Sequence, residues 1–199
     1  MHKFTHLELT LPLVVVAHDA GAANLIIGWL RNQQELEVRT CLEGPAINLW
    51  TAVFGKPQIS QPNDAIIGAG TLLSGTSHIS ELEHTARTLA IAHNIPSIGV
   101  IDHWVNYPGR FSRKGKLVLP DEIWVSDRYA LEIANRVFPN IHVLQKPNAY
   151  LEHFKLQVEI ESRRLKKRFS RRILYALEPI RHKWTAGGQA GEFQALDYF

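Results

Sequence analysis

Ser97–Phe111 reads Ser-Ile-Gly-Val-Ile-Asp-His-Trp-Val-Asn-Tyr-Pro-Gly-Arg-Phe, an apolar run followed by a polar, aromatic and charged segment. Its first part, Ile98–Ile101, is a short apolar run that follows Pro96 and is typical of a buried strand. Polar, aromatic and charged residues follow it at once. In open α/β sheets, ligands bind outside the carboxyl ends of the strands. The stretch therefore predicts a buried strand with a functional loop at its carboxyl end.

A strand–helix alternation extends to both sides of this segment. Strands are predicted at 11–17, 38–42, 65–69, 98–101, 123–125 and 141–144, although a short helix is also compatible with 65–69. Up to residue 147 the βα pattern repeats about five times. This pattern is typical of a mostly parallel sheet with helices on both faces, so the chain is predicted to be an α/β protein.

Two helix starts have recognisable signals. Ser80-Glu81-Leu82-Glu83 matches a capping box, in which Ser80 caps the helix and Glu83 reaches back to it. Ser126 or Asp127 is expected to cap the helix that follows the strand at 123–125.

Composition places the chain among ordinary soluble proteins. Of its 199 residues 45% are hydrophobic and 21% are charged, and the net charge is +3. No apolar run reaches the roughly 20 residues of a membrane helix, and the N-terminus lacks the pattern of a signal peptide. Cys41 is the only cysteine, which excludes a disulfide framework. These features favour a cytoplasmic location.

Two more loops follow predicted strands and carry small or polar residues. The turn at 18–24 is rich in small residues, which lets the backbone approach a ligand and points helix N–H groups at an anion. It matches neither a GxGxxG fingerprint nor a P-loop, and close helix–strand packing explains it equally well. The segment 70–80 is rich in small hydroxyl residues.

The candidate catalytic residues at these strand ends are Asp102, His103, His18 and Asp19. A carboxylate or a histidine can accept a proton from a substrate hydroxyl, and Asp102 is the first candidate, with His18 and Asp19 as a rival pair. Arg110 is expected to hold an anionic group, and Trp104 and Tyr107 to stack on a sugar or base. The candidate binding residues are Gly21, Asn24, Thr76, Ser77, Trp104, Asn106, Tyr107 and Arg110.

Simpler roles stay open for several of these residues. Asp102 could cap the next turn, and Trp104 could belong to the core. His78, His84 and His103 do not match the spacing of a zinc motif, so no metal site is predicted.

The C-terminal part has a different character. Residues 151–172 combine an apolar stripe with a run of Arg and Lys, which indicates a basic connecting helix. An anionic membrane surface is an alternative partner for this helix, whereas no motif indicates nucleic-acid binding. A further strand is predicted at 173–178 and a further helix at 192–199.

Several segments carry a family resemblance: Ser74–Ser80, Ser80–Glu83, Asp102–Tyr107 with Arg110 and Phe111, Pro120–Asp127, and Asn148–Leu151. Together they resemble the N-terminal half of glycosyltransferase-B-like proteins of bacterial surface-polysaccharide clusters, which are close in fold to non-hydrolysing nucleotide-sugar epimerases. The resemblance spans roughly residues 12–178, and Asp-His-Trp-Val-Asn-Tyr is its most specific part.

The resemblance implies two Rossmann-like domains that face each other across a cleft. The first holds the acceptor, the second holds most of the nucleotide sugar, and catalysis needs no bound metal or other cofactor. The expected boundaries are a Rossmann-like domain at 1–150, the connecting helix at 151–172, and the first strand and helix of an incomplete second domain at 173–199.

The expected function is that of the acceptor-side domain of a nucleotide-sugar-dependent glycosyltransferase in polysaccharide or glycolipid biosynthesis. Its partners would be a sugar nucleotide, a glycan or lipid-linked acceptor, and a second chain that supplies the missing domain. Its location would be the cytoplasm, with the inner membrane face as an alternative. A sugar-nucleotide epimerase and a non-catalytic ligand-binding or assembly domain remain alternatives.

Overall fold

A computed structural model describes residues 9–33 and 36–164 of the chain. The chain divides into two compact units, Met1–Ile160 and Glu161–Phe199. Only the last residues of one helix are described in the second unit. The strand and helix predicted at 173–199, and the basic residues beyond 164, lie outside the described residues.

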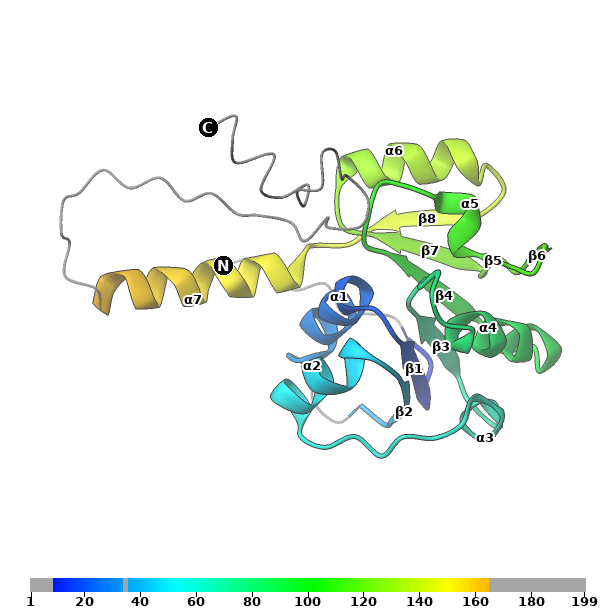
Figure 1. Ribbon diagram of the computed structural model, residues 1–199, viewed down its shortest axis with the longest axis horizontal. Helices are drawn as coiled ribbons and strands as arrows, with labels where there is room; N and C mark the ends of the chain where they lie inside the picture. Colours follow the sequence, from blue (N-terminus) through cyan, green and yellow to red (C-terminus); the bar gives the residue numbers. More distant parts are fainter. Residues whose placement is uncertain (1–8, 34–35, 165–199) are drawn as a thin grey trace, which may run out of the picture. The chain divides into compact units, whose positions relative to one another are not determined.

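A six-stranded parallel sheet forms the centre of the first unit (Figure 1). Its strand order is β2-β1-β3-β4-β7-β8, and every neighbouring pair is parallel. The strands are β1 (Leu13–Ala17), β2 (Val38–Leu42), β3 (Thr71–Ser74), β4 (Ser97–Ile101), β7 (Glu122–Val125) and β8 (His142–Gln145).

Helices cover both faces of this sheet, as the sequence predicts. One face carries α1 (Ala20–Leu30), α2 (Pro45–Phe54) and the start of α7 (Ala149–Arg164). The other carries α3 (Pro62–Ile66), α4 (Leu82–Ala92), the short α5 (Tyr107–Arg110) and α6 (Arg128–Val137). A small hairpin, β5 (Ser112–Arg113) and β6 (Lys116–Leu117), follows α5. The arrangement is α/β and Rossmann-like, which confirms the predicted fold class.

The alternating direction of side chains along β1 lets this strand contribute to the hydrophobic core on each face of the sheet. Successive side chains of a strand point to opposite faces, so Val15 packs against the α1 side, whereas Val14 and Val16 pack against α3 and α4. All five residues of β1 are buried, which accounts for its unbroken apolar sequence.

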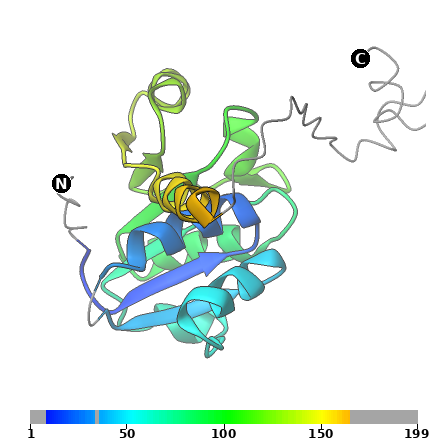
Figure 2. The same cartoon turned by 90° about the vertical axis from the view of Figure 1, so that its left-hand side faces the viewer.

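A glycine brings the start of α7 close to α1 (Figure 2). A Cβ atom at Gly28 would lie 2.8 Å from the backbone nitrogen of Tyr150 and 3.3 Å from Ala149 Cβ. The Trp29 indole N–H donates to the Pro147 carbonyl at 2.7 Å in the same region. These contacts hold the segment after β8 and the start of α7 against α1.

No strand forms at 65–69, and the alternative prediction of a short helix holds for residues 65 and 66. Ala65 and Ile66 end α3, which begins at Pro62, and the third strand is Thr71–Ser74, which the sequence pattern placed in a loop. A short apolar run does not distinguish strand from helix by itself. Gly68, at φ +67°, then turns the chain before β3 begins.

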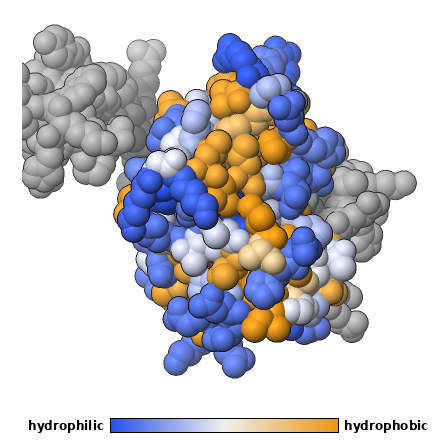
Figure 3. Space-filling model, turned by 90° about the vertical axis from the view of Figure 1, so that its right-hand side faces the viewer, coloured by the Kyte–Doolittle hydropathy of each residue, from blue (hydrophilic) through white to orange (hydrophobic). Residues whose placement is uncertain are grey.

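The molecule also exposes apolar residues away from the carboxyl ends of the strands. Figure 3 shows a band of apolar residues, bordered by hydrophilic ones, on the side that faces right in Figure 1, where α4 and the β5–β6 hairpin lie. Exposed apolar side chains on these elements include Ile91 and Leu117. Within the described ranges, no helix is long and apolar enough to cross a membrane.

Candidate functional site

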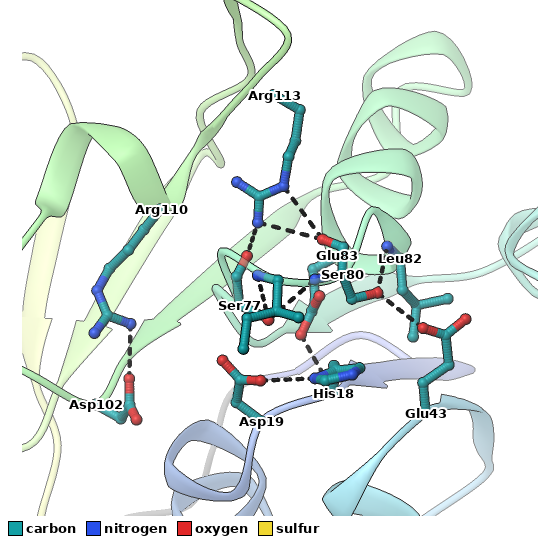
Figure 4. A network of polar contacts seen from close by, with 11 residues as sticks. His18, Asp19, Glu43, Ser77, Ser80, Leu82, Glu83, Asp102, Arg110 and Arg113 are labelled. Atoms are coloured by element: carbon teal, nitrogen blue, oxygen red, sulfur yellow. Dashed lines mark hydrogen bonds and ion pairs between the residues drawn. The ribbon is translucent and has the colours of Figure 1, made fainter. Parts of the chain in front are cut away.

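The site lies where the strand order changes direction. The chain passes from β1 through α1 to β2, and then crosses to β3 on the other side of β1. The helices that follow β1 and β3 therefore leave the sheet on opposite faces, which opens a crevice between the carboxyl ends of these strands. The polar contacts of Figure 4 gather at this edge.

His18 and Asp19 form a pair directly after β1. His18 Nδ1 and Asp19 Oδ1 are 2.7 Å apart, and both side chains are partly exposed. Because an ionised carboxylate only accepts hydrogen bonds, an imidazole that donates to Asp19 does so through a proton on Nδ1. A Cβ atom at Gly44 would lie 2.8 Å from Nε2, so the glycine makes room for the ring.

Glu83 does not form the predicted capping box. The helix begins at Leu82, whose N–H donates to Ser80 Oγ at 3.0 Å, and Glu83 turns away from this end. Its Oε1 accepts the backbone N–H of His18 at 2.9 Å. The side chain is buried, and burial raises the pKa of its carboxyl group. Glu83 thus belongs to the polar network of the site.

Asp102 and Arg110 form an ion pair at the carboxyl end of β4. Arg110 Nη1 donates to Asp102 Oδ1 at 2.9 Å and also contacts Thr76 Oγ1 at 3.4 Å. A Cβ atom at Gly21 would overlap Asp102 Oδ2 and lie 2.6 Å from its Cγ. The glycine at the start of α1 therefore allows this carboxylate to lie against the helix.

A small pocket opens beside this carboxylate. Its volume is about 160 Å³, and it is lined by Gly21, Asn24, Leu25, Asp102, Ser126, Asn148 and Tyr150. The lining comes from α1 and from the segments that follow β4, β7 and β8. The pocket joins predicted site residues from two loops, Gly21 and Asn24 with Asp102. Ser126, Asn148 and Tyr150 were not predicted as site residues.

Trp104 is exposed but held in place. The residue is 55% exposed, and its indole N–H donates to the Asp127 carboxylate at 3.0 Å. Asp127 also caps α6, as predicted, by accepting the Ala130 N–H at 2.9 Å. The interpretation of Trp104 as a core residue is therefore wrong. His103 is exposed as well, and its Nδ1 accepts the Trp104 backbone N–H.

Tyr107 does not offer a ring to a ligand. It is 2% exposed, its hydroxyl donates to the Ala130 carbonyl, and its ring packs near Phe138. The predicted stacking role is therefore wrong for Tyr107. Burial of its ring between α5 and α6 removes apolar surface from water, which stabilises the fold. Asn106, just before it, adopts φ +56° and places its amide over Gly109.

Thr76 and Ser77 support the loop after β3. Both are buried; Thr76 Oγ1 donates to the Val100 carbonyl at 2.9 Å, and Ser77 Oγ accepts the Ile79 N–H at 3.1 Å. Arg113 holds the same loop, since its guanidinium donates to the carbonyls of Ser77 and Ser80. These hydroxyls shape the site rather than face a ligand.

Several site residues were missed by sequence reasoning. Glu83 was assigned to a cap, and nothing in the sequence around Arg113 indicated that it would bind a loop 33 residues away. Glu43, which accepts the Ser80 hydroxyl at 2.8 Å, follows β2 directly, and its position at a strand end was an available signal. In the described part of the chain, no three His, Cys, Asp or Glu side chains are grouped to hold a metal ion.

Comparisons with protein-family models, with curated proteins and with solved structures found no match to this chain.

Proposed function

We propose that this domain is the acceptor-side domain of a nucleotide-sugar-dependent glycosyltransferase that acts in polysaccharide or glycolipid assembly. The observation that carries the proposal is the pocket in which Asp102 meets Gly21 and Asn24. These residues come from loops after different strands, at the sheet edge where α/β proteins bind ligands.

The chemistry of the pocket favours a sugar. Sugar hydroxyl groups both donate and accept hydrogen bonds, and the lining offers a carboxylate, two amides and a hydroxyl from Asp102, Asn24, Asn148 and Ser126. Tyr150, 43% exposed, adds an aromatic ring at the same pocket. A small site with many neutral polar groups suits a sugar ring better than a large planar cofactor.

Sugar transfer requires a proton acceptor. As the proton leaves the acceptor hydroxyl, its oxygen bonds to the anomeric carbon of the donor, and the bond from that carbon to the diphosphate oxygen breaks. Asp102 is the first candidate for the base, because it is the one carboxylate of the pocket lining. His18, oriented by Asp19, is the second candidate.

Arg110 has a more specific role than general attraction of an anion. Its Nε donates to the Val105 carbonyl at 3.1 Å, while Nη1 holds Asp102. The guanidinium therefore fixes one oxygen of the carboxylate and leaves the other beside Gly21. The donor diphosphate would be held by the second domain that the family resemblance implies.

A non-catalytic assembly domain is the second candidate function. The observation in its favour is the apolar surface of α7, where Tyr150, Leu151, Phe154 and Val158 are exposed. An exposed apolar helix surface is typical of a protein-binding element.

A thermal-shift titration tests the proposal. The protein would be heated with sugar nucleotides, with neutral glycans and with free nucleotides, because a ligand that binds the folded state raises the melting temperature. Asp102→Asn, Arg110→Ala and His18→Gln would be compared with Asp64→Asn, an exposed carboxylate on α3. Glycans should raise the melting temperature of the parent and the control, but not that of Asp102→Asn.

Product analysis separates the remaining functions. Transfer that Asp102→Asn abolishes and His18→Gln spares would assign the base to Asp102, and the reverse would assign it to His18. Alteration of a sugar nucleotide without any acceptor would indicate an epimerase. A folded protein that responds to none of these ligands would refute the proposal in favour of the assembly domain.

A further inference from the structure

The backbone N–H of His18, directly after β1, donates to a side chain and not to a carbonyl of a neighbouring strand. In β1, the Val16 carbonyl accepts Gly75 N–H at 2.8 Å on the β3 side, and the Ala17 carbonyl accepts Glu43 N–H at 3.1 Å on the β2 side. Because the backbone groups of successive residues point to alternate neighbours, the His18 N–H points towards β3, while its carbonyl accepts the Ala46 N–H at 3.2 Å. There β3 has ended at Ser74.

A carboxylate from α4 accepts the hydrogen bond that a carbonyl of a longer β3 would accept. The Gly75 carbonyl, which lies next in the ladder, accepts Arg87 Nη1 at 2.9 Å. Glu83 Oε1 accepts the His18 N–H at 2.9 Å instead, across 65 residues of sequence. A buried backbone N–H requires such a partner, so this bond fixes the first residue after β1.

The surroundings of Glu83 hold the carboxylate in this position. Its side chain is 1% exposed, and the next turns of its helix bury Ala86 and Ala90 against the sheet core. A Cβ atom at Gly75 would lie 3.1 Å from Glu83 Oε1, so the glycine leaves the space that the carboxylate uses. The carboxylate end of the bond is therefore packed within the core.

Charged groups on both sides act on Glu83. Arg87, one turn along α4, favours the ionised carboxylate, whereas Asp19, beside His18, opposes it. Within the described residues, Glu83 Oε2 and two nitrogens of Arg87 are buried without a hydrogen-bond partner. The Oε1–His18 bond is thus the contact that gives this buried carboxylate a defined geometry.

We infer that Glu83 is the positioning residue of the His18–Asp19 pair. Its bond to the His18 backbone sets where the β1 segment turns into α1, and therefore where the imidazole and the Asp19 carboxylate face the crevice. The inference rests on the proposed function only in assigning a use to the pair; the positioning itself is measurable without any substrate.

The test compares two substitutions of Glu83 by NMR. Glu83→Gln keeps a carbonyl oxygen that can accept the His18 N–H, whereas Glu83→Leu fills a similar volume and cannot accept. Glu81→Gln and Glu81→Leu, at an exposed position just before α4, are the matched controls. The readouts are the chemical shift of the His18 amide and the pH titration of its ring, assigned with His18→Gln.

The amide shift and the ring titration should be kept in Glu83→Gln and both Glu81 variants, and should change in Glu83→Leu. If transfer activity is found, Glu83→Leu should lose about 10- to 100-fold in rate, as expected for a displaced reacting group. If Glu83→Leu does not fold, Gly75→Ala presses on the same carboxylate and should change the His18 signals. Unchanged His18 signals in folded Glu83→Leu or Gly75→Ala, or failure of glutamine to preserve them, would overturn the inference, whatever ligand the protein binds.

Discussion

Replacing Gly21 by alanine should destabilise this protein, although the same change stabilises most helices. Gly21 is the second residue of α1, and alanine in place of glycine inside a helix ordinarily adds about 0.5–1 kcal/mol. At this position the new methyl group would overlap Asp102 Oδ2 and lie 2.6 Å from Asp102 Cγ. The sign of the effect therefore depends on what it costs to move Asp102.

If Asp102 moves away from residue 21, its contact with Arg110, which donates to its Oδ1 at 2.9 Å, is weakened. A hydrogen bond to a charged group contributes about 1.5–3 kcal/mol. The two side chains are 21% and 11% exposed, and solvent screening moves the value towards the lower end. After subtraction of the helix gain, a net loss of about 1 kcal/mol remains, which lowers the melting temperature by about 2–4 °C.

Urea denaturation of four proteins isolates this contact: the parent, Gly21→Ala, Asp102→Ala and the double variant. In the Asp102→Ala background only a Cβ atom remains near residue 21, at 3.1 Å, and a small shift relieves it. Gly21→Ala should then be neutral or stabilising by up to about 1 kcal/mol. The two backgrounds should differ by about 1–2 kcal/mol, the usual size of a coupling between touching residues.

An equal effect of Gly21→Ala in both backgrounds would refute this reasoning. A gain of stability in the parent would do the same, because it would mean that Asp102 does not lie against α1. The pocket on which the proposed function depends would then lack one wall. Circular dichroism at matched protein concentration is sufficient to distinguish these outcomes.

Three further predictions concern other contacts. Gly28→Ala should lower the free energy of unfolding by about 1–3 kcal/mol, because the new Cβ atom meets the backbone of Tyr150 at 2.8 Å; a gain in urea denaturation would contradict it. Burial raises the pKa of Glu83, so its contribution to stability is present at low pH and lost as the pH rises above its ordinary value of 4.5. Glu83→Gln should therefore lose less stability than the parent as the pH rises above 4.5 in urea denaturation, and parallel losses would contradict this. Burial raises the pKa of the Cys41 thiol to about 11, so Ellman's reagent should modify it only after denaturation, and rapid labelling of the native protein would contradict the core position.

The strands were predictable where a continuous apolar run is bounded by proline or polar residues. Val14–Val16 and Ile98–Ile101 are apolar at every position because both faces of a parallel sheet are covered, and proline or polar residues mark their ends. Asp127 was one of two predicted caps, with Ser126 as the other, because a cap acts on the helix directly after it. Local signals of this kind do not need the rest of the fold.

The site was predictable only in outline. Strand ends located Asp102 and His18, because every carboxyl end of a parallel sheet reaches the same edge. The partner of Glu83 was not predictable, since its bond to His18 depends on the crossover that places β3 beside β1. Tyr107 was misassigned for a related reason: a polar loop can still send one aromatic side chain back into the core.

One arrangement recurs in all three loops of the site. The loop after β1 is held by Glu83, the loop after β3 by Arg113, and the carboxylate after β4 by Arg110. The contacts of Glu83 and Arg113 join segments that are far apart in the sequence, whereas Arg110 and Asp102 belong to the same segment after β4. Because these loops are already fixed, a ligand that enters the pocket need not order them, and the free energy of its own contacts is not spent on loop closure. A site of this construction should bind a small ligand with little backbone change, which favours recognition of one sugar ring over induced closure around a larger substrate.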